Sequence, residues 1–176
     1  MKETLVTLID EERIKWKVEK LARIISFEYR KKTPVLIGVL NGASIFMADL
    51  SRKLTMPIRV EFIKVSSYGK GTTSSQKSKI VSLAEGKIKG EDLVIVEDIV
   101  DTGATTRKLV SFLKELKPRS IKICSLLDKK DCRKIPINID YVGFEVPDKF
   151  LVGYGLDYRQ CYRNLPYIAY MRKARK

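Results

Sequence analysis

Apolar positions near the start of the chain recur with the period of a helix. From about Asp10 to Arg30 they fall three and four residues apart, so that one side of a helix would be buried and the other solvated. Acidic residues stand at positions 10 to 12, where they stabilise the positive end of a helix dipole. The segment is therefore predicted to be an amphipathic helix. Its buried positions are Ile14, Val18, Leu21, Ala22, Ile25 and Tyr29.

Several later segments have the pattern of strands. Continuous apolar runs, typical of strands buried on both faces, occur in PVLIGVL (34–40), DLVIVE (92–97) and IKICSLL (121–127). The segment IRVEFIKVSSY (58–68) alternates well enough to be a strand. The run KIVSL (79–83) is predicted to return beside it as the second arm of a hairpin.

Helical patterns separate these strands. One helix is expected from Ser44, which can cap it, to about Leu54, and another over 107–116, where Pro118 stops it. Beyond residue 140 the apolar runs YVGFEV, FLVGYG and PYIAYM follow. Strands that alternate with helices predict an α/β fold with a mostly parallel central sheet flanked by helices.

The composition fits one globular domain over residues 1–176. Hydrophobic residues make up 44% of the chain, enough to build a sizeable core. The charge is 35 basic minus 21 acidic residues, or +14, and the Lys and Arg residues are spread along the whole chain. Three interpretations fit this surplus, and charge alone does not separate them: a solvated basic surface, attraction of a polyanionic substrate, or salt-sensitive binding of nucleic acid.

The chain contains no histidine, which removes the commonest general base and every metal site that needs an imidazole. Acid–base chemistry must therefore use Asp, Glu, Lys, Tyr or Cys. The three cysteines, Cys124, Cys132 and Cys161, form no CxxC pair and suit a reducing cytoplasm. The first ten residues lack the apolar core of an export signal, and no apolar run approaches about 18 residues. We therefore expect a cytoplasmic protein without a membrane span.

The stretch VIVEDIVDTGATT (94–106) places acids and small polar residues at one sheet edge. Glu97 and Asp98 lie where the strand is expected to end, and ligands of α/β folds collect beyond that end. The following TGATT precedes a helix expected to start near Arg107. Free amides at a helix N-terminus favour an anion.

The composition of this loop also favours close approach of a phosphate. Gly103 permits a tight turn, and the hydroxyls of Thr102, Thr105 and Thr106 add hydrogen-bond donors. The neighbouring carboxylates can accept hydrogen bonds from vicinal hydroxyls. Because a sugar phosphate has both groups, the stretch predicts a sugar-phosphate site.

Two other interpretations of the stretch stay open at this point. Asp101 and Thr102 could serve only as a helix cap, with Glu97 and Asp98 in solvent. VDTGAT also resembles the active-site triplet of aspartic proteases, although those are all-β proteins and a helical pattern follows here. The GxxxxGK[ST] spacing of a Walker loop and the GxGxxG of dinucleotide folds are both absent.

VIVEDIVDTGATT resembles the phosphoribosyl-diphosphate (PRPP) motif of type I phosphoribosyltransferases, and its E-D-I-x-D-T-G form is that of the hypoxanthine-guanine branch. Further matches occur in the same order along about residues 35 to 165. They are VLNGA (39–43), SSY (66–68), SLLDKK (125–130) and VGFEVPDKFLVGYGLDYRQCYRN (142–164). The resemblance implies a core over about 35–135 and a small hood formed by the N-terminal segment and about 140–176.

The resemblance implies a role for each part of the PRPP motif. Glu97 and Asp98 would hold the ribose hydroxyls, and Asp101 would be the general base beside the purine imidazole ring. The 5′-phosphate would be wrapped by Thr102, Gly103, Ala104 and Thr105. Ala104 replaces a commoner lysine, but the position mainly supplies a main-chain amide.

Pyrophosphate would be bound by a second loop and a distant arginine. Leu40, Asn41 and Gly42 match a family loop that has a non-proline cis peptide between its first two residues. Many relatives have lysine where this chain has Asn41, so Arg163 is expected to provide the cationic contact. Asp157 would help to hold Mg²⁺, with Glu97 and Asp98 as possible outer-shell ligands.

The purine would be recognised by residues near the end of the chain. Lys129 would donate to the 6-oxo group, Phe150 would stack on the base, and the Leu151 backbone would meet its far edge. Without the resemblance, Lys129 fits a surface turn and Phe150 fits the core. Ser67, Tyr68 and the polar loop after them would form a flexible lid.

The implied activity is transfer of 5-phosphoribosyl from magnesium-bound PRPP to hypoxanthine or guanine, giving IMP or GMP and pyrophosphate. The family also implies a homo-oligomer, either a dimer or a tetramer. A different class stays in view: regulators of this fold sense PRPP and bind nucleic acid. About thirty residues precede PVLIGVL, fewer than an added DNA-binding module needs, so nucleic acid is the less expected partner. An RNA-binding surface on the core itself stays open.

Overall fold

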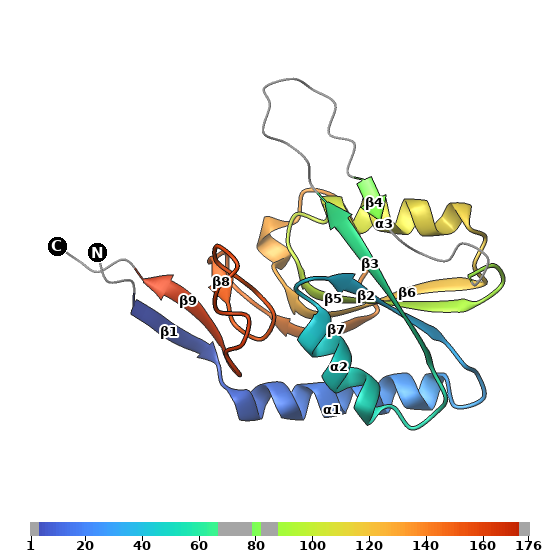
Figure 1. The fold of residues 1–176 in the computed structure, drawn as a ribbon, viewed down its shortest axis with the longest axis horizontal. Coiled ribbons are helices and arrows are strands. Elements are labelled where there is room, and N and C mark those ends of the chain that lie inside the picture. The colour runs from blue at the N-terminus through green and yellow to red at the C-terminus, as the bar shows by residue number, and fades with distance from the viewer. Residues whose placement is uncertain (1–3, 67–78, 82–87, 173–176) are drawn as a thin grey trace, which may run out of the picture.

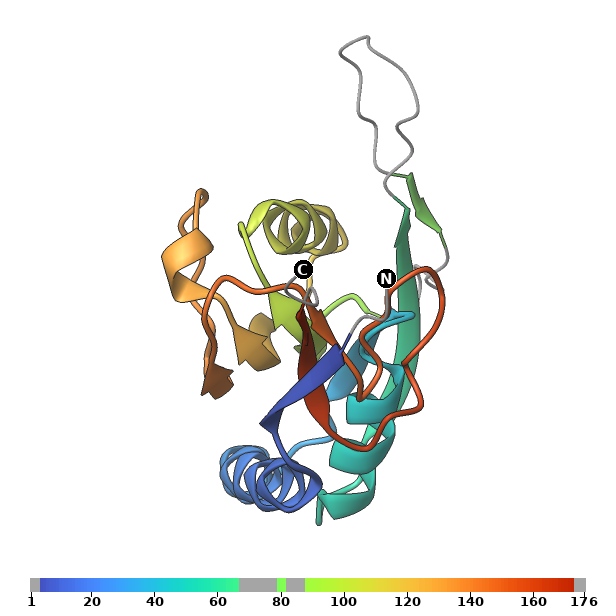
Figure 2. The same cartoon turned by 90° about the vertical axis from the view of Figure 1, so that its left-hand side faces the viewer.

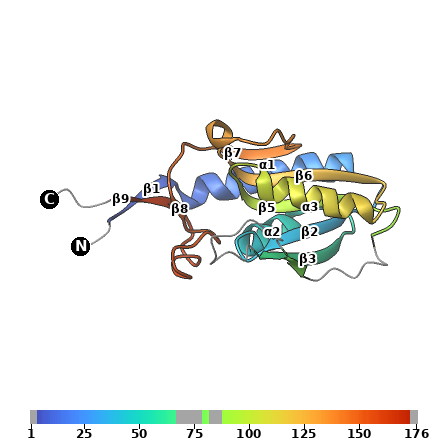
Figure 3. The ribbon, with the colours of Figure 1, turned by 90° about the horizontal axis from the view of Figure 1, so that it is seen from above.

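A six-stranded sheet forms the centre of the protein (Figure 1), whose computed structural model describes residues 4–66, 79–81 and 88–172. The strand order is β4-β3-β2-β5-β6-β7, and Figure 3 shows the strands from β7 to β3 side by side. Five strands are parallel, and β4 runs antiparallel to β3. The α/β prediction is confirmed. The bounds are β2 Val35–Leu40, β3 Arg59–Ser66, β4 Lys79–Val81, β5 Asp92–Val100, β6 Ser120–Asp128 and β7 Tyr141–Glu145.

Helices cover both faces of this sheet. Helices α1 (Glu11–Glu28) and α2 (Ser44–Lys53) pack on one face, and α3 (Ala104–Glu115) packs on the other. Figure 2 shows the sheet between them. None of the helices in the described ranges is long and apolar enough to cross a membrane.

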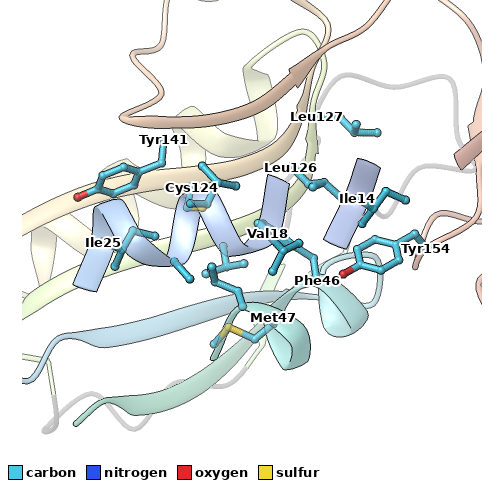
Figure 4. Close-up of a cluster of buried hydrophobic side chains, with 14 of the residues drawn as sticks. Ile14, Val18, Ile25, Phe46, Met47, Cys124, Leu126, Leu127, Tyr141 and Tyr154 are labelled. Carbon is cyan, nitrogen blue, oxygen red and sulfur yellow. The ribbon is translucent and has the colours of Figure 1, made fainter. Parts of the chain in front are cut away.

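Strand β5 shows why the apolar runs are continuous. Leu93 and Ile95 face the core beneath α3, whereas Val94 and Val96 face the core beneath α1 and α2. Alternate side chains of a strand point to opposite faces, so a strand covered on both faces needs apolar residues at every position. In Figure 4 side chains of α1, α2 and β6 meet in one of these cores. The labelled members include Ile14, Val18, Ile25, Phe46, Met47, Cys124 and Leu126.

A second, three-stranded antiparallel sheet joins the two ends of the chain (Figure 1). Its order is β1 (Thr4–Ile9), β9 (Ile168–Arg172) and β8 (Leu151–Val152). Strand β1 is not among the predicted elements. It pairs with residues near the other end of the chain, beginning with Thr4 opposite Arg172.

Some predicted boundaries are wrong for local reasons. Ser44 is the first residue of α2 and does not cap it: its hydroxyl donates backwards to the Asn41 carbonyl over 2.8 Å. Helix α3 begins at Ala104, three residues before the predicted Arg107. Strand β5 continues to Val100 because its pairing with β6 extends to Asp128.

Other boundaries agree with the sequence pattern. Asp10 caps α1, and its carboxylate accepts the Arg13 amide over 2.8 Å. The hairpin predicted from KIVSL is present where Val65 pairs with Ile80.

Candidate active site

Two adjoining hollows lie where the carboxyl ends of the parallel strands meet the segment around β8. They have volumes of about 320 and 310 Å³. We call the first the phosphate-side hollow, which Glu97, Asp98 and the loop from Asp101 to Thr106 line. The second is the base-side hollow. Its lining includes Asn41, Gly42, Asp98, Asp101, Lys129, Phe150, Leu151, Asp157 and Arg163.

The loop from Asp101 to Thr105 turns sharply from β5 into α3. Gly103 has φ of 84°, and an added Cβ there would lie 2.6 Å from the Ile135 carbonyl oxygen. Both the backbone angle and the space therefore require glycine. Within the described ranges the amides of Thr102, Gly103 and Thr105 have no acceptor, and the Ala104 amide has only a 3.4 Å contact to Thr102 Oγ1. These amides are free to bind an anion at the start of α3.

A second segment, residues 133–135, holds this loop from behind. The amides of Lys134 and Ile135 donate to the Thr102 carbonyl over 3.1 and 3.0 Å. Arg133 Nε donates to the Asp101 carbonyl over 3.0 Å, and its guanidinium also pairs with Asp128. Because these contacts use loop carbonyls, they leave the loop amides facing the hollow.

Sequence reasoning missed Arg133. The only sequence signal was its position in the charged run DKKDCRK, directly after a buried strand. That run lies about thirty residues from the loop that it braces, so the partner was not visible from the pattern.

Glu97 is buried, with 4% of its surface exposed, and it turns towards α3. The Thr106 hydroxyl donates to its carboxyl group, although burial and the nearby Asp98 raise the pKa of Glu97 well above its usual value. Thr106, also buried, was expected to add a donor for phosphate. Thr106 lines the phosphate-side hollow and also contacts Glu97, so its role as a donor for phosphate stays a prediction.

Asp98 is half-buried and turns towards the other side of β5. A Cβ added at Gly42 would lie 1.7 Å from Asp98 Oδ2, so only glycine lets the two loops approach. Burial raises the pKa of Asp98 to about 6, against the effect of its main-chain hydrogen bonds and of Arg163. The interpretation that left Glu97 and Asp98 in solvent is therefore wrong, as is an aspartic protease fold.

The Leu40–Asn41 peptide is cis, as the resemblance implied. Asn41 is exposed, and its carbonyl is used by the Ser44 hydroxyl and amide, at 2.8 and 3.3 Å. Asn41 and Gly42 line the base-side hollow, and Gly42 also lines the phosphate-side hollow. This loop therefore lies where the two hollows join.

Arg163 and Asp157 form an ion pair. Their closest atoms, Nη2 and Oδ1, are 2.7 Å apart, and each side chain is about one quarter exposed. Arg163 also donates to the Gly155 carbonyl over 2.7 Å, while Asp157 accepts the Gln160 amide over 2.9 Å. Arg163, assigned to pyrophosphate, and Asp157, assigned to Mg²⁺, therefore lie together, and each is bound to the other in this structure.

Lys129 is buried and lies between two carboxylates. Its Nζ is 3.5 Å from Asp101 Oδ2 and 3.4 Å from Asp148 Oδ1. The alternative of a surface lysine is wrong, since the side chain is 9% exposed. Asp101 is about half exposed, and Asp148, which sequence reasoning missed, is 76% exposed.

Phe150 is 58% exposed beside the base-side hollow, and the alternative that placed it in the core is wrong. Its ring and that of Tyr158 are nearly perpendicular, with centroids 5.7 Å apart. Leu151 is buried in β8, where it pairs with Tyr170. Ser67 and Tyr68, the predicted lid residues, lie outside the described residues.

Within the described ranges no group of three or more acidic or cysteine side chains could hold a metal ion by itself. Asp98 and Asp157 nevertheless both line the base-side hollow. Mg²⁺ usually takes one or two carboxylates and completes its shell with water and substrate phosphates. The residues present fit an ion of that kind, brought with a phosphorylated substrate.

The chain matches the phosphoribosyl transferase domain family over residues 7–159. It is 48% identical to a hypoxanthine-guanine phosphoribosyltransferase of Bacillus subtilis, over 95% of this chain and 93% of the relative. The corresponding Aquifex aeolicus protein is 49% identical over 92% of each chain. A crystal structure of a hypoxanthine-guanine phosphoribosyltransferase from Bacillus anthracis, with HEPES in its active site, superposes with a TM-score of 0.88. It is 40% identical, and the match covers 96% of this chain and 99% of that one.

Proposed function

The chain belongs to the phosphoribosyl transferase family, and we propose that it is a purine salvage enzyme acting on hypoxanthine, guanine or both. It would transfer 5-phosphoribosyl from PRPP to the base and release pyrophosphate. The relatives carry enzyme names at high coverage, which favours this function over a PRPP-sensing regulator.

One observation carries the proposal: free main-chain amides lie beside two acids in a single hollow. The amides of Thr102, Gly103 and Thr105 would bind the 5′-phosphate at the start of α3. Glu97 and Asp98 line the same hollow and would accept hydrogen bonds from the ribose hydroxyls. Burial raises the pKa of both acids, which means that their charged forms are poorly stabilised in the protein alone. Hydroxyl donors from a ribose would stabilise these charged forms.

The base would bind in the second hollow. Phe150 offers an exposed ring for stacking, and Lys129 would donate to the 6-oxo group. A 6-amino group is itself a donor and offers the Lys129 ammonium no acceptor, so adenine would lose this hydrogen bond and should be rejected. The main chain at Leu151 would meet the far edge of the base.

In the reaction the bond from C1′ to pyrophosphate breaks and a bond from C1′ to the purine nitrogen forms. Asp101 would take the proton that leaves the imidazole ring, which a half-exposed carboxylate at the junction of the hollows can reach. Arg163 would bind the departing pyrophosphate by exchanging its partner Asp157 for the phosphate. Asp157, with Asp98 nearby, would hold Mg²⁺, which would neutralise charge on the pyrophosphate.

We also propose a cytoplasmic location, as three cysteines without a CxxC pair suggest, and assembly into a dimer or tetramer. The division into a core and a hood is likewise a proposal. The small sheet of β1, β9 and β8 would be part of that hood.

The direct test is turnover with PRPP and Mg²⁺ against hypoxanthine, guanine, xanthine and adenine in parallel. Hypoxanthine, guanine or both should be consumed with release of pyrophosphate, and adenine as the sole acceptor would overturn the proposal. Asp101→Asn should lower turnover by roughly 10²–10⁴-fold, the usual contribution of a general base. Asp131→Asn, an exposed acid nearby, is the matched control.

A further inference from the structure

The solvent side of α1 carries three large apolar side chains in positions where an amphipathic helix is normally polar. Trp16 is 58% exposed, Ile24 is 45% exposed and Phe27 is 73% exposed. They lie on the side opposite the buried residues of the same helix, such as Val18 and Ile25. Figure 1 shows α1 along the lower edge of the molecule, where no other element covers it from below.

Cations are interleaved with these apolar side chains. At 3.6 residues per turn, the four cations within the helix and the three apolar residues share one arc of about 120°, and Arg30 follows in the turn just after the helix. Lys17 Nζ and Lys20 Nζ lie 5.4 and 5.3 Å from the centre of the Trp16 ring. The Arg30 guanidinium lies 4.8 Å from the centre of the Phe27 ring. We call this surface the α1 outer face: Arg13, Trp16, Lys17, Lys20, Arg23, Ile24, Phe27 and Arg30.

The acids of α1 do not neutralise these cations, because each acid is paired elsewhere. Glu11 and Glu12 bind Lys15 at 2.9 and 3.0 Å, and Glu19 binds Lys53 at 2.8 Å. Glu28 pairs with Lys122 of β6. By contrast, none of the five cations of the outer face forms an ion pair with a described residue. Part of the +14 charge is therefore concentrated here, and Glu19, which is paired with Lys53, offsets it only in part beside Arg23.

We propose that the α1 outer face is a binding surface for single-stranded nucleic acid. Each nucleotide offers one flat ring and one phosphate, and this face alternates exposed rings with cations that form no ion pair within the described part of the chain. The distance from Trp16 to Phe27 is about 16 Å along the helix, which spans several nucleotides. Proteins that bind single strands without sequence preference combine these same two groups, a basic track and aromatic platforms.

Two other occupants fit the face less well. A second copy of the chain would bring the same five cations against each other across a two-fold axis. A bilayer surface would bury the Trp16 ring, but the Lys17 and Lys20 ammonium groups lie 5.4 and 5.3 Å from that ring and would have to move away from it to stay in water.

The surface is separate from the two hollows of the active site. None of its residues lines either hollow. Nucleic acid bound there should therefore leave purine turnover unchanged, which makes this inference independent of the proposed enzymatic function.

Trp16 is the only tryptophan of the chain, so its fluorescence reports on this face alone. The probe is a 20-nucleotide oligouridylate, titrated into the full-length protein while emission is recorded at several salt concentrations. A base stacked on the indole should quench the emission. Inorganic polyphosphate, which has the charge but no bases, should compete for the site without the same quenching.

Two double variants separate stacking from charge. Removing both rings, in Trp16→Ala with Phe27→Ala, should weaken binding about 30-fold or more when it is measured by anisotropy of a labelled oligonucleotide, at about 1–3 kcal/mol per stacked base. Replacing Lys20 and Arg23 by Ala should reduce the slope of log K against log salt by about 1.4, or 0.7 per phosphate contact. The matched control replaces Lys89 and Lys114, two exposed lysines away from α1, by Ala. In this control variant, the slope of log K against log salt should equal that of the parent protein.

Several results would overturn the inference. Equal oligouridylate affinity in the parent and in the variant without rings would show that stacking contributes nothing. A blue shift of Trp16 emission with anionic phospholipid vesicles, without quenching by oligouridylate, would assign the face to a membrane. Sedimentation showing that self-association buries Trp16 would assign it to a second copy.

Discussion

The two hollows of the active site differ in how far they are prepared for a ligand. On the phosphate side the donors are main-chain amides that have no protein acceptor, on a loop whose carbonyls are held by residues 133–135. On the base side the functional groups are side chains that already have partners. Arg163 is paired with Asp157, and Lys129 lies between Asp101 and Asp148.

This difference predicts different energetics of binding. The phosphate site needs no rearrangement of its amides, so a phosphate gains their full hydrogen bonds. The base and pyrophosphate must replace existing ion pairs, so their net gain is smaller. Damage to the phosphate side should therefore cost more than loss of a partner on the base side.

The largest effect is expected for Gly103→Ala. A Cβ at φ of 84° is strained, and it would also lie 2.6 Å from the Ile135 carbonyl oxygen, so the loop must move. PRPP binding, measured by calorimetry, should weaken by about 100-fold or more.

Gly90→Ala is the matched control. Gly90 has a similar φ of 74°, but an added Cβ would meet nothing within 4 Å. It should therefore show the cost of backbone strain in stability without loss of PRPP affinity. Equal PRPP affinities in the two variants would contradict a preformed phosphate loop.

The next effect is expected for Lys129→Ala. Loss of a hydrogen bond from a buried ammonium to the 6-oxo group should lower kcat/KM for hypoxanthine about 10- to 150-fold. The KM for PRPP should change little, because Lys129 does not line the phosphate-side hollow. Lys130→Ala removes the exposed neighbour and serves as control. If both variants behaved alike, recognition of the 6-oxo group by Lys129 would be wrong.

A third expectation concerns pH and stability. The pKa of Asp98 is raised to about 6 in the folded protein, so the folded state holds this proton more tightly than the unfolded state does. Its contribution to the free energy of unfolding is therefore present below about pH 4 and is lost as pH rises towards 6 and beyond. For this half-buried carboxyl the loss should be on the order of 1–2 kcal/mol.

Urea unfolding of the parent and of Asp98→Asn at pH 4.5 and pH 7.5 measures this contribution. The free energy of unfolding of the variant minus that of the parent should be larger at pH 7.5 than at pH 4.5. A difference between the two proteins that does not change with pH would contradict a raised pKa at Asp98.

The smallest effect is expected for Asp148→Asn. This exposed acid competes for the Lys129 ammonium, and exposed ion pairs contribute about 0–1 kcal/mol. Its removal should make Lys129 easier to transfer to the base and lower KM for hypoxanthine roughly two- to fivefold. Asp131→Asn is the control. An increase in KM would mean that Asp148 positions Lys129 for the base and does not compete with it.

Much of the phosphate side was predictable because it depends on local chemistry. A buried strand, a Thr-Gly-Ala-Thr turn and a helix follow one another within 94–106, so their meeting needs no distant partner. The error in the start of α3 is local as well. Ala104 begins α3 because the Gly103 carbonyl already accepts the Arg107 amide.

The base side was predictable only through resemblance. Taken alone, Phe150 fitted the core and Lys129 fitted a surface turn. Phe150 packs against Tyr158 within the segment around β8, and Lys129 meets Asp148 only when that segment reaches the end of β6. The spacing of hydrophobic residues predicts local helices and strands, and it does not predict contacts between distant segments.

The sequence by itself determined the α/β class, most helices and strands, and a glycine turn at the start of α3, because residue spacing and glycine act over a few neighbouring residues. The tertiary structure decided which distant groups meet. It paired β1 with β9, placed Arg133 behind the loop at Asp101, and brought Lys129 next to Asp148. Such contacts depend on strand order and register, which the whole chain fixes when it buries its core.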